Sequence, residues 1–315
     1  NTGSVVVGGL LNTASSYSFV GSGERNQATL NSVVGGGLLN IASGFSFVGS
    51  GVLNKALNGY SSIVGGFQNI TSGSYSFIGG GCFNIVGINS VVVGGTSNTA
   101  TGECSFVGGG VCNKSTNTGS VVVGGVYNTA SSACSFIGGG CNNFTNNSNE
   151  FMFIGGGSNN CMISDDPHSV IVGGDSNLVN DAACAFIGGG YQNTIRDGVN
   201  GSVVVGGNLN TASSDCSFIG AGSSNQATQT NAVVVGGSRN TASGTNSFVG
   251  GGNENSITGA TSYNLIVGGN RNKIVGSTNS GHIIVGGSCN LSNNGSTGGG
   301  HSTIVGGSFN TASGA

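Results

Sequence analysis

One short pattern recurs twenty times along this chain of 315 residues, and it constrains the fold more than any other feature. Each copy has an apolar pair, two or three small residues that are mostly glycine, two variable residues and an asparagine. The asparagines are Asn12, Asn26, Asn40, Asn54, Asn69, Asn84, Asn98, Asn113, Asn128, Asn143, Asn160, Asn177, Asn193, Asn210, Asn225, Asn240, Asn255, Asn272, Asn290 and Asn310. They are 14–15 residues apart in the first half and 15–20 apart later. Such a period is typical of repeat folds, in which each repeat buries its apolar side chains against its neighbours.

The residue types within one repeat predict two short strands and two turns. The apolar run is rich in β-branched and aromatic residues, which favour strands. The glycines permit positive φ and close backbone approach, and asparagine tolerates the left-handed region, so both suit corners. The alanines two residues after many of the asparagines are expected to point inward. We therefore predict an all-β, parallel β-solenoid over residues 1–315, a single repetitive domain of about 20 coils with roughly 14–20 residues each. Looser repeats and longer insertions are expected from about residue 144 onward.

A second coil length is compatible with part of the pattern. Repeats of the form SVVVGG and SF(V/I)GGG alternate over most of the chain, which also allows about 10 two-sided coils of roughly 30 residues. The alternation breaks where Phe136 and Phe153 fall in successive repeats, and this favours one repeat per coil. Cys104 and Cys134 separate the alternatives. They stack within disulfide reach in the longer coil and are two coils apart in the shorter one.

Stacking predicts two continuous rows of side chains. The twenty asparagines form a ladder along the stack, with amides bonding to neighbouring coils and turns. The aromatic residues form an apolar stack of Phe19, Phe47, Phe77, Phe106, Phe136, Phe153, Phe186, Phe218 and Phe248. Adjacent strand residues face opposite sides, yet both residues of each pair are apolar. An outer stripe carrying Val6, Phe19, Phe47, Ile63 and Phe77 is therefore expected to be buried against another copy of the chain.

Composition argues against several classes of function. Only 17 residues are charged, the net charge is −3, and no basic patch indicates nucleic acid as a partner. No apolar run reaches 18 residues, so membrane insertion is not expected. The nine cysteines are an odd number and lack the spacing of a zinc site. The glycine runs lack the lysine and serine or threonine of a phosphate-binding loop. We predict no catalytic residues, no cofactor, no metal and no enzymatic activity.

Two local features allow weaker interpretations. Asp165, Asp166, Pro167 and His168 form the densest polar cluster, which we interpret as a surface loop, with weak calcium binding as the alternative. Seven sequons suggest glycosylation only weakly, because a chain so rich in asparagine, serine and threonine contains about that many by chance. They begin at Asn69, Asn113, Asn143, Asn146, Asn200, Asn290 and Asn294.

The repeats SVVVGG-x-x-NTAS and SFIGGG-x-x-N resemble the head repeats of YadA-like trimeric autotransporter adhesins. The resemblance covers almost the whole chain at the level of the repeat pattern. It implies a left-handed parallel β-roll that trimerises, with one strand residue facing the core and its neighbour facing the partner chains. The low charge and the GGG-x-x-N form depart from that family's pattern, and its neck, stalk and membrane anchor do not appear in the sequence.

The sequence favours a structural function. The chain has no initiator methionine or signal peptide, and we expect it to be a processed product or a piece of a longer chain. Its last repeat continues into its first across a hypothetical junction, so we expect head-to-tail self-assembly. The predicted function is a structural subunit of an extracellular or virion-associated fibre, located outside the cell or on a virion or cell surface. The alternatives are a trimeric adhesin or receptor-binding head with a host or surface ligand, and an ice-binding solenoid, which would need an unbroken threonine row.

Overall fold

The computed structural model describes residues 3–146, 151–163, 168–259, 262–276, 281–294 and 300–314. It is an all-β, parallel β-solenoid of about 18–20 stacked coils with two main sheets of 20 strands, which confirms the predicted fold class. None of the described residues lies in a helix, so none of them forms a helix that could cross a membrane.

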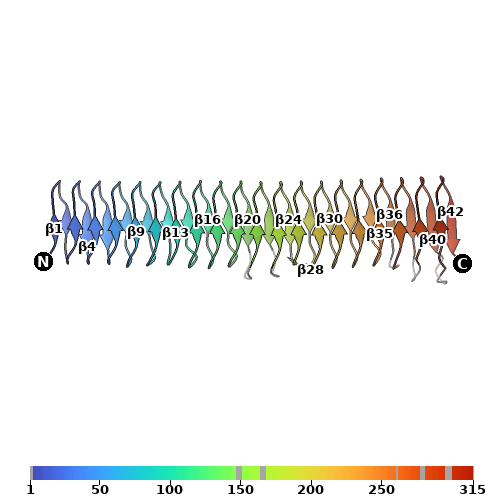
Figure 1. Ribbon diagram of the computed structural model, residues 1–315, viewed down its shortest axis with the longest axis horizontal. Coiled ribbons are helices and arrows are strands. Elements are labelled where there is room, and N and C mark those ends of the chain that lie inside the picture. Colours follow the sequence, from blue (N-terminus) through green and yellow to red (C-terminus); the bar gives the residue numbers. More distant parts are fainter. Residues whose placement is uncertain are drawn as a thin grey trace. The chain divides into compact units, whose positions relative to one another are not determined.

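The chain forms two compact units, which are Asn1–Phe151 with Gly155–Gly157, and Met152–Ile154 with Ser158–Ala315. Within each unit the coils follow one another along the sequence, and each coil contributes one strand to each sheet (Figure 1).

In the first unit, the first sheet contains β1 (Val5–Val6), β3 (Phe19–Val20), β5 (Val33–Val34), β7 (Phe47–Val48), β9 (Ser62–Ile63), β11 (Phe77–Ile78), β13 (Val91–Val92), β15 (Phe106–Val107), β17 (Val121–Val122) and β19 (Phe136–Ile137). The second sheet contains β2 (Thr13–Ala14), β4 (Gln27–Thr29), β6 (Ile41–Ser43), β8 (Lys55–Ala56), β10 (Ile70–Thr71), β12 (Ile85–Val86), β14 (Thr99–Ala100), β16 (Lys114–Ser115), β18 (Thr129–Ala130) and β20 (Phe144–Asn146).

In the second unit, the first sheet contains β21 (Phe153–Ile154), β23 (Val170–Ile171), β26 (Phe186–Ile187), β29 (Val203–Val204), β31 (Phe218–Ile219), β33 (Val233–Val234), β35 (Phe248–Val249), β37 (Leu265–Ile266), β39 (Ile283–Ile284) and β41 (Thr303–Ile304). The second sheet contains β22 (Cys161–Ile163), β24 (Leu178–Asn180), β27 (Thr194–Ile195), β30 (Thr211–Ala212), β32 (Gln226–Ala227), β34 (Thr241–Ala242), β36 (Ser256–Thr258), β38 (Lys273–Val275), β40 (Leu291–Asn294) and β42 (Thr311–Gly314). A small additional sheet pairs β25 (Ala182–Ala183) with β28 (Val199–Asn200).

Strand register fixes one repeat per coil. Val5 pairs with Phe19, and Phe19 pairs with Val33, so consecutive repeats are hydrogen-bonded neighbours. The alternative of about 30 residues per coil is therefore wrong. All nine cysteines are free thiols, as expected for Cys104 and Cys134 two coils apart.

The core is formed by one residue from each short strand. Val20, Val48 and Ile78 of the first sheet are fully buried, as are Ala28 and Ala42 of the second. The alanines after the asparagine therefore point inward, as predicted. Ile63 is also fully buried, and Val6 has the register of the inward Val20, although Val6 itself is 45% exposed in the first coil. These two residues were expected on the outer stripe. That placement is wrong, because the outer residue of each pair is the one before them.

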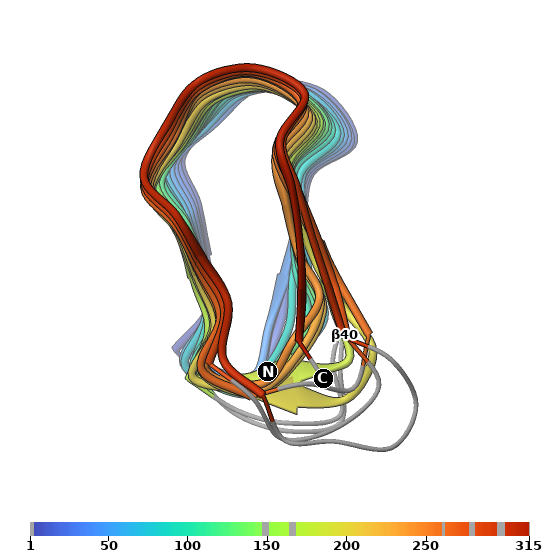
Figure 2. The same ribbon diagram turned by 90° about the vertical axis from the view of Figure 1, so that its right-hand side faces the viewer.

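Two corners join the sheets in each coil, which appears end-on as an elongated loop with two long sides (Figure 2). We call the turn that ends at the repeat asparagine the glycine corner. There, the glycine three residues before the asparagine has φ near +90°, as in Gly110 and Gly237. The residue directly before the asparagine is also left-handed, although it is leucine, arginine, phenylalanine or another non-glycine residue. The asparagine lies at the corner, as expected, but it is not itself among the left-handed residues.

We call the opposite turn, which leads into the first sheet, the serine corner. A left-handed residue also occurs there in most coils, for example Tyr60, Tyr75 and Cys104. The cost of a left-handed conformation for a non-glycine residue is about 1–2 kcal/mol. The corner residues offset it by donating their backbone N–H to the preceding coil, as Tyr75 does to Gly59 O at 3.0 Å.

Candidate functional site: the asparagine ladder and the outer faces

The side chain of each repeat asparagine bonds to its own coil and to the next coil. Asn113 shows the geometry: its Nδ2 donates to Gly109 O of the same coil at 2.8 Å and to Gly125 O of the next coil at 2.7 Å. Its Oδ1 accepts the backbone N–H of Asn128 at 3.0 Å. Eighteen of the twenty asparagines are buried, while Asn12 and Asn310 are more exposed. The predicted ladder positions thus lie in one buried row within each unit.

The ladder explains why the glycine corner needs glycine. A Cβ on Gly110 would lie 2.1 Å from Gly125 O and 2.6 Å from Asn113 Nδ2. These are the groups that form the ladder, so a side chain at this position displaces the hydrogen bonds between coils. The amide and the glycine three residues before it therefore act as one structural element.

A second buried polar row went unpredicted. The serine that precedes the outward strand residue is buried in most coils. In some coils its hydroxyl accepts the N–H of the equivalent residue in the next coil. Ser46 N donates to Ser32 Oγ at 3.1 Å, and Ser105 N donates to Ser90 Oγ at 3.1 Å. The recurring serine of SVVVGG and SFIGGG was a visible signal, but serine alone does not distinguish an exposed position from a buried one.

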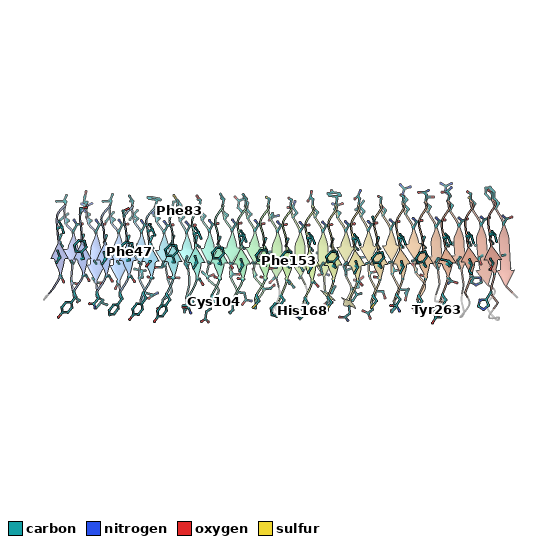
Figure 3. The ribbon with its side chains drawn as sticks, viewed as in Figure 1. Phe47, Phe83, Cys104, Phe153, His168 and Tyr263 are labelled. Carbon is teal, nitrogen blue, oxygen red and sulfur yellow. The ribbon has the colours of Figure 1, made fainter. Side chains whose placement is uncertain are left out.

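The predicted phenylalanines form the outer face of the first sheet, as Figure 3 shows for Phe47 in the first unit. Within each unit they mostly alternate with aliphatic residues, so Phe106 pairs with Val91 and Val121 rather than with another phenylalanine. Phe47 and Phe77 instead both pair with Ser62. Phe19, Phe47, Phe77, Phe153 and Phe248 are 36–41% exposed, and the other four are half-buried. This face has no charged residue among the described strands.

On this face, a phenylalanine and the glycine two residues after it in one coil can take the positions that two valines hold in the next coil. In the coil of Phe106, the ring edge lies 3.3 Å from where a Cβ on Gly108 would be. In the next coil, Val121 and Val123 occupy the two equivalent positions. Seven side-chain carbons in the coil of Phe106 therefore match six in the next coil, so these two coils present a similar apolar surface.

The outer row of the second sheet is mixed. In the first unit it runs through Ile70, Ile85, Thr99, Lys114 and Thr129 in register. The threonines are thus interrupted by lysine and isoleucine, and the described strands do not provide the unbroken threonine row that an ice-binding face needs.

The glycine corner differs between the units. In the first unit its two variable positions are mainly apolar and border a shallow groove of about 260 Å³, lined by Leu53, Lys55, Gln68, Ile70, Phe83 and Ile85. In the second unit the same positions are mainly polar. Glu254 accepts from Arg271 at 2.7 Å and from Arg239 at 3.2 Å, and these hydrogen bonds lower the pKa of its carboxyl group.

The sequons fall into two groups. Asn69, Asn113, Asn143 and Asn290 are ladder residues with buried, hydrogen-bonded amides, so the folded solenoid leaves no room for a glycan there. Asn146 and Asn200 are exposed, and glycosylation there stays a prediction. The side chain of Asn294 lies outside the described residues.

The polar cluster can be placed only in part. Asp165, Asp166 and Pro167 lie outside the described residues, and His168 occupies the serine corner with φ 73°. Among the residues that the structure describes, no three His, Cys, Asp or Glu side chains gather where they could hold a metal ion.

No protein-family model matches this chain, and no curated protein matches its sequence. The fold and the side-chain geometry are therefore the basis for a functional proposal.

One buried titratable group interrupts the serine row of the second unit. His282 takes the serine position, and its Nδ1 lies 2.7 Å from Ser302 Oγ and 2.9 Å from Ser292 Oγ. Asn264 Oδ1 accepts its backbone N–H at 3.0 Å. Burial, and to a lesser extent the charge of His301, lower the pKa of His282 below its usual value.

We expect acid to destabilise these coils through His282. A lowered folded-state pKa means that the unfolded chain takes up a proton near pH 6.5 while the folded chain resists it, so stability falls as pH decreases below that value. Urea-unfolding midpoints at pH 7.5 and 5.5 measure the loss. His282→Ser introduces the residue that the next coil has at this position, Ser302, and should reduce the loss. An equal loss in both proteins would contradict the assignment.

Proposed function

We propose that this chain is a structural subunit of a fibre outside the cell or on a virion, and that it assembles through stacked β-coils. The observation that carries the proposal is the ladder. Each coil accepts the Asn Nδ2 of the preceding coil at a glycine carbonyl and donates its own Nδ2 to the next coil. Each coil thus has an Asn Nδ2 donor on the side that faces the next coil and a glycine carbonyl acceptor on the side that faces the preceding coil. This complementarity supports head-to-tail stacking between copies. The unpaired backbone N–H and C=O groups at the edge of a sheet readily pair with another chain.

The apolar face of the first sheet supports a second candidate, a laterally associated oligomer such as a trimeric adhesin or receptor-binding head. An aromatic side chain presents about 150–250 Å², so a phenylalanine that is 36–41% exposed leaves roughly 60–100 Å² uncovered. If every coil left a comparable area, ten coils would leave roughly 600–1,000 Å² uncovered, a range that includes the value of about 800 Å² per partner of a stable interface. Typical monomers do not exceed about 300–600 Å² in one apolar patch.

Electron microscopy of the purified full chain tests both candidates. Filaments that lengthen with protein concentration and diffract near 4.8 Å along their axis support the fibre. Isolated rods with the mass of a closed oligomer support the lateral assembly alone. Monomers at every concentration would contradict both candidates.

A lysine on the apolar face should separate lateral from axial assembly. Val121→Lys places a charge on the outer face of β17, and we expect it to abolish lateral association because the charge would be buried without a partner. Thr129→Lys, in β18 of the same coil, is the control, since Lys114 occupies the equivalent position one coil earlier. Light scattering and sedimentation report the mass. Equal assembly of the two variants would show that the first-sheet face is not an interface.

A further inference from the structure

Two pairs of cysteines occupy equivalent places at the serine corner, one pair in each unit. In the first unit Cys104, Gly119 and Cys134 occupy this corner in three successive coils. In the second unit Cys184, Gly201 and Cys216 do the same. All four cysteines are exposed free thiols with φ of 50–57°. Figure 3 shows Cys104 at the edge of the first unit opposite Phe83.

Backbone hydrogen bonds fix the order of the three residues along each column. Gly119 N donates to Glu103 O at 2.8 Å, and Cys134 N donates to Thr118 O at 2.8 Å. In the second unit, Gly201 N donates to Ala183 O and Cys216 N to Asn200 O, at 3.0 and 2.8 Å. Each pair of cysteines is therefore held on one rigid corner, two coils apart.

The glycine between the cysteines leaves a notch. A Cβ on Gly119 would lie 3.3 Å from Cys134 Sγ, and a Cβ on Gly201 would lie 3.7 Å from Cys216 Sγ. The later sulfur of each pair thus lies next to the space that a side chain would otherwise fill. At most other coils of this corner the position holds tyrosine, asparagine, phenylalanine or histidine, which would fill that space, while Gly3 and Gly281 also lack a side chain there.

The spacing between the two cysteines of each pair is too long for a disulfide and is close to the span of one metal ion that bridges the two sulfurs. Two coils separate the Cα atoms by about 9.6 Å, whereas disulfides need about 4.4–6.8 Å and an S–S bond of about 2.05 Å. Replacing that bond by two metal–sulfur bonds of about 2.3 Å extends the reach by about 2.6 Å, to about 9.4 Å, within about 0.2 Å of the two-coil spacing. We propose that each Cys–Gly–Cys column is a two-coordinate thiolate site for a soft monovalent ion, Cu(I) or Ag(I).

The chemistry of the column fits that ion. Thiolates prefer soft metals, and an exposed carboxylate directly precedes one cysteine of each pair, Glu103 before Cys104 and Asp215 before Cys216. On binding, two thiols lose two protons and form two sulfur–metal bonds, without any change in oxidation state. The product carries one net negative charge.

Titration of the reduced full chain with Ag(I) tests the proposal, with native mass spectrometry to count bound ions. We expect two ions to bind before the remaining thiols react. Cys134→Ser and Cys216→Ser should each remove one of them, and affinity at the altered column should fall at least about a hundredfold because the second ligand is lost. Cys112→Ser, at the glycine corner, is the control and should leave both ions.

Gly119→Asn tests the notch without removing a thiol. Asparagine occurs at this corner at Asn89 and Asn231 with φ of 53° and 56°, so the fold should tolerate it. We expect one tight ion to be lost while the count of reactive thiols stays at nine. X-ray absorption of the two-ion complex should show two sulfur neighbours per ion. Binding of about one ion per thiol, retention of both ions in Gly119→Asn, or ions that join two chains would overturn the proposal.

Discussion

Replacing Gly237 by alanine is expected to destabilise the second unit by more than about 4 kcal/mol, or to prevent its folding. Gly237 has φ +86°, and a Cβ there would lie 2.2 Å from Gly252 O and 2.5 Å from Asn240 Nδ2. No rotation of a methyl group relieves these contacts. The chain must either separate two coils or give up the Asn240 side-chain bonds to Gly236 O and Gly252 O.

The preceding residue provides a matched control. The nearest atom to a Cβ on Gly236 is Ala221 O at 3.8 Å, and Ala221 holds the equivalent position one coil earlier. Gly236→Ala should therefore keep stability within about 1 kcal/mol of the parent, with any change favouring the folded state. Urea unfolding followed by circular dichroism compares the two variants. Similar midpoints would show that the corner has room for a side chain and that the ladder geometry is wrong.

Asn225→Ala is expected to have the next largest effect, a loss of roughly 2–6 kcal/mol. The substitution removes the donors to Ala221 O and Gly237 O, both at 3.0 Å, and the acceptor for Asn240 N at 3.0 Å. Ala221 O and the buried Asn240 N–H then lose these partners, at about 1–3 kcal/mol each, whereas Gly237 O keeps the N–H of Ser223 at 2.9 Å. The effect should be far larger than that of one lost surface hydrogen bond.

Asn180→Ala is the control for this prediction. Asn180 is an exposed asparagine at the end of β24 in the same unit, and its loss should change stability by less than about 0.5 kcal/mol. Hydrogen exchange adds a local readout, because the amide of Asn240 should lose protection in Asn225→Ala. A variant as stable as the parent would show that water replaces the side chain, and that the ladder adds little to stability.

The sequence predicted the parts of this fold that depend on period. The spacing of the asparagines gave the coil length, and breaks in the alternation of Val5-type and Phe19-type repeats correctly favoured one repeat per coil. The inward position of Ala28 and Ala42 also followed from their recurrence two residues after asparagine.

Local conformation was harder to predict. The left-handed corner residue is the variable one before the asparagine, such as Leu53 or Phe83, because its N–H bonds to the preceding coil whatever its side chain. The assignment of Ile63 to the outer stripe failed because two adjacent apolar residues do not show which one faces inward. The Cys–Gly–Cys columns could not be recognised before the coil length was fixed.

The register described above also makes chain length modular. Strand partners lie one repeat apart, so each coil depends chiefly on the coil before it and the coil after it. Removing residues 99–113 would join Asn98 to Lys114 and leave the same sequence of donors and acceptors across the junction. The coils differ in length only between the asparagine and the next strand of the first sheet, so the asparagines lie 14–20 residues apart while the strand register is kept. A deletion between that strand and the next asparagine would instead turn side chains of the coil to the wrong face. Residues can therefore be added or lost at the serine corner, whereas the stack itself grows or shortens by whole coils.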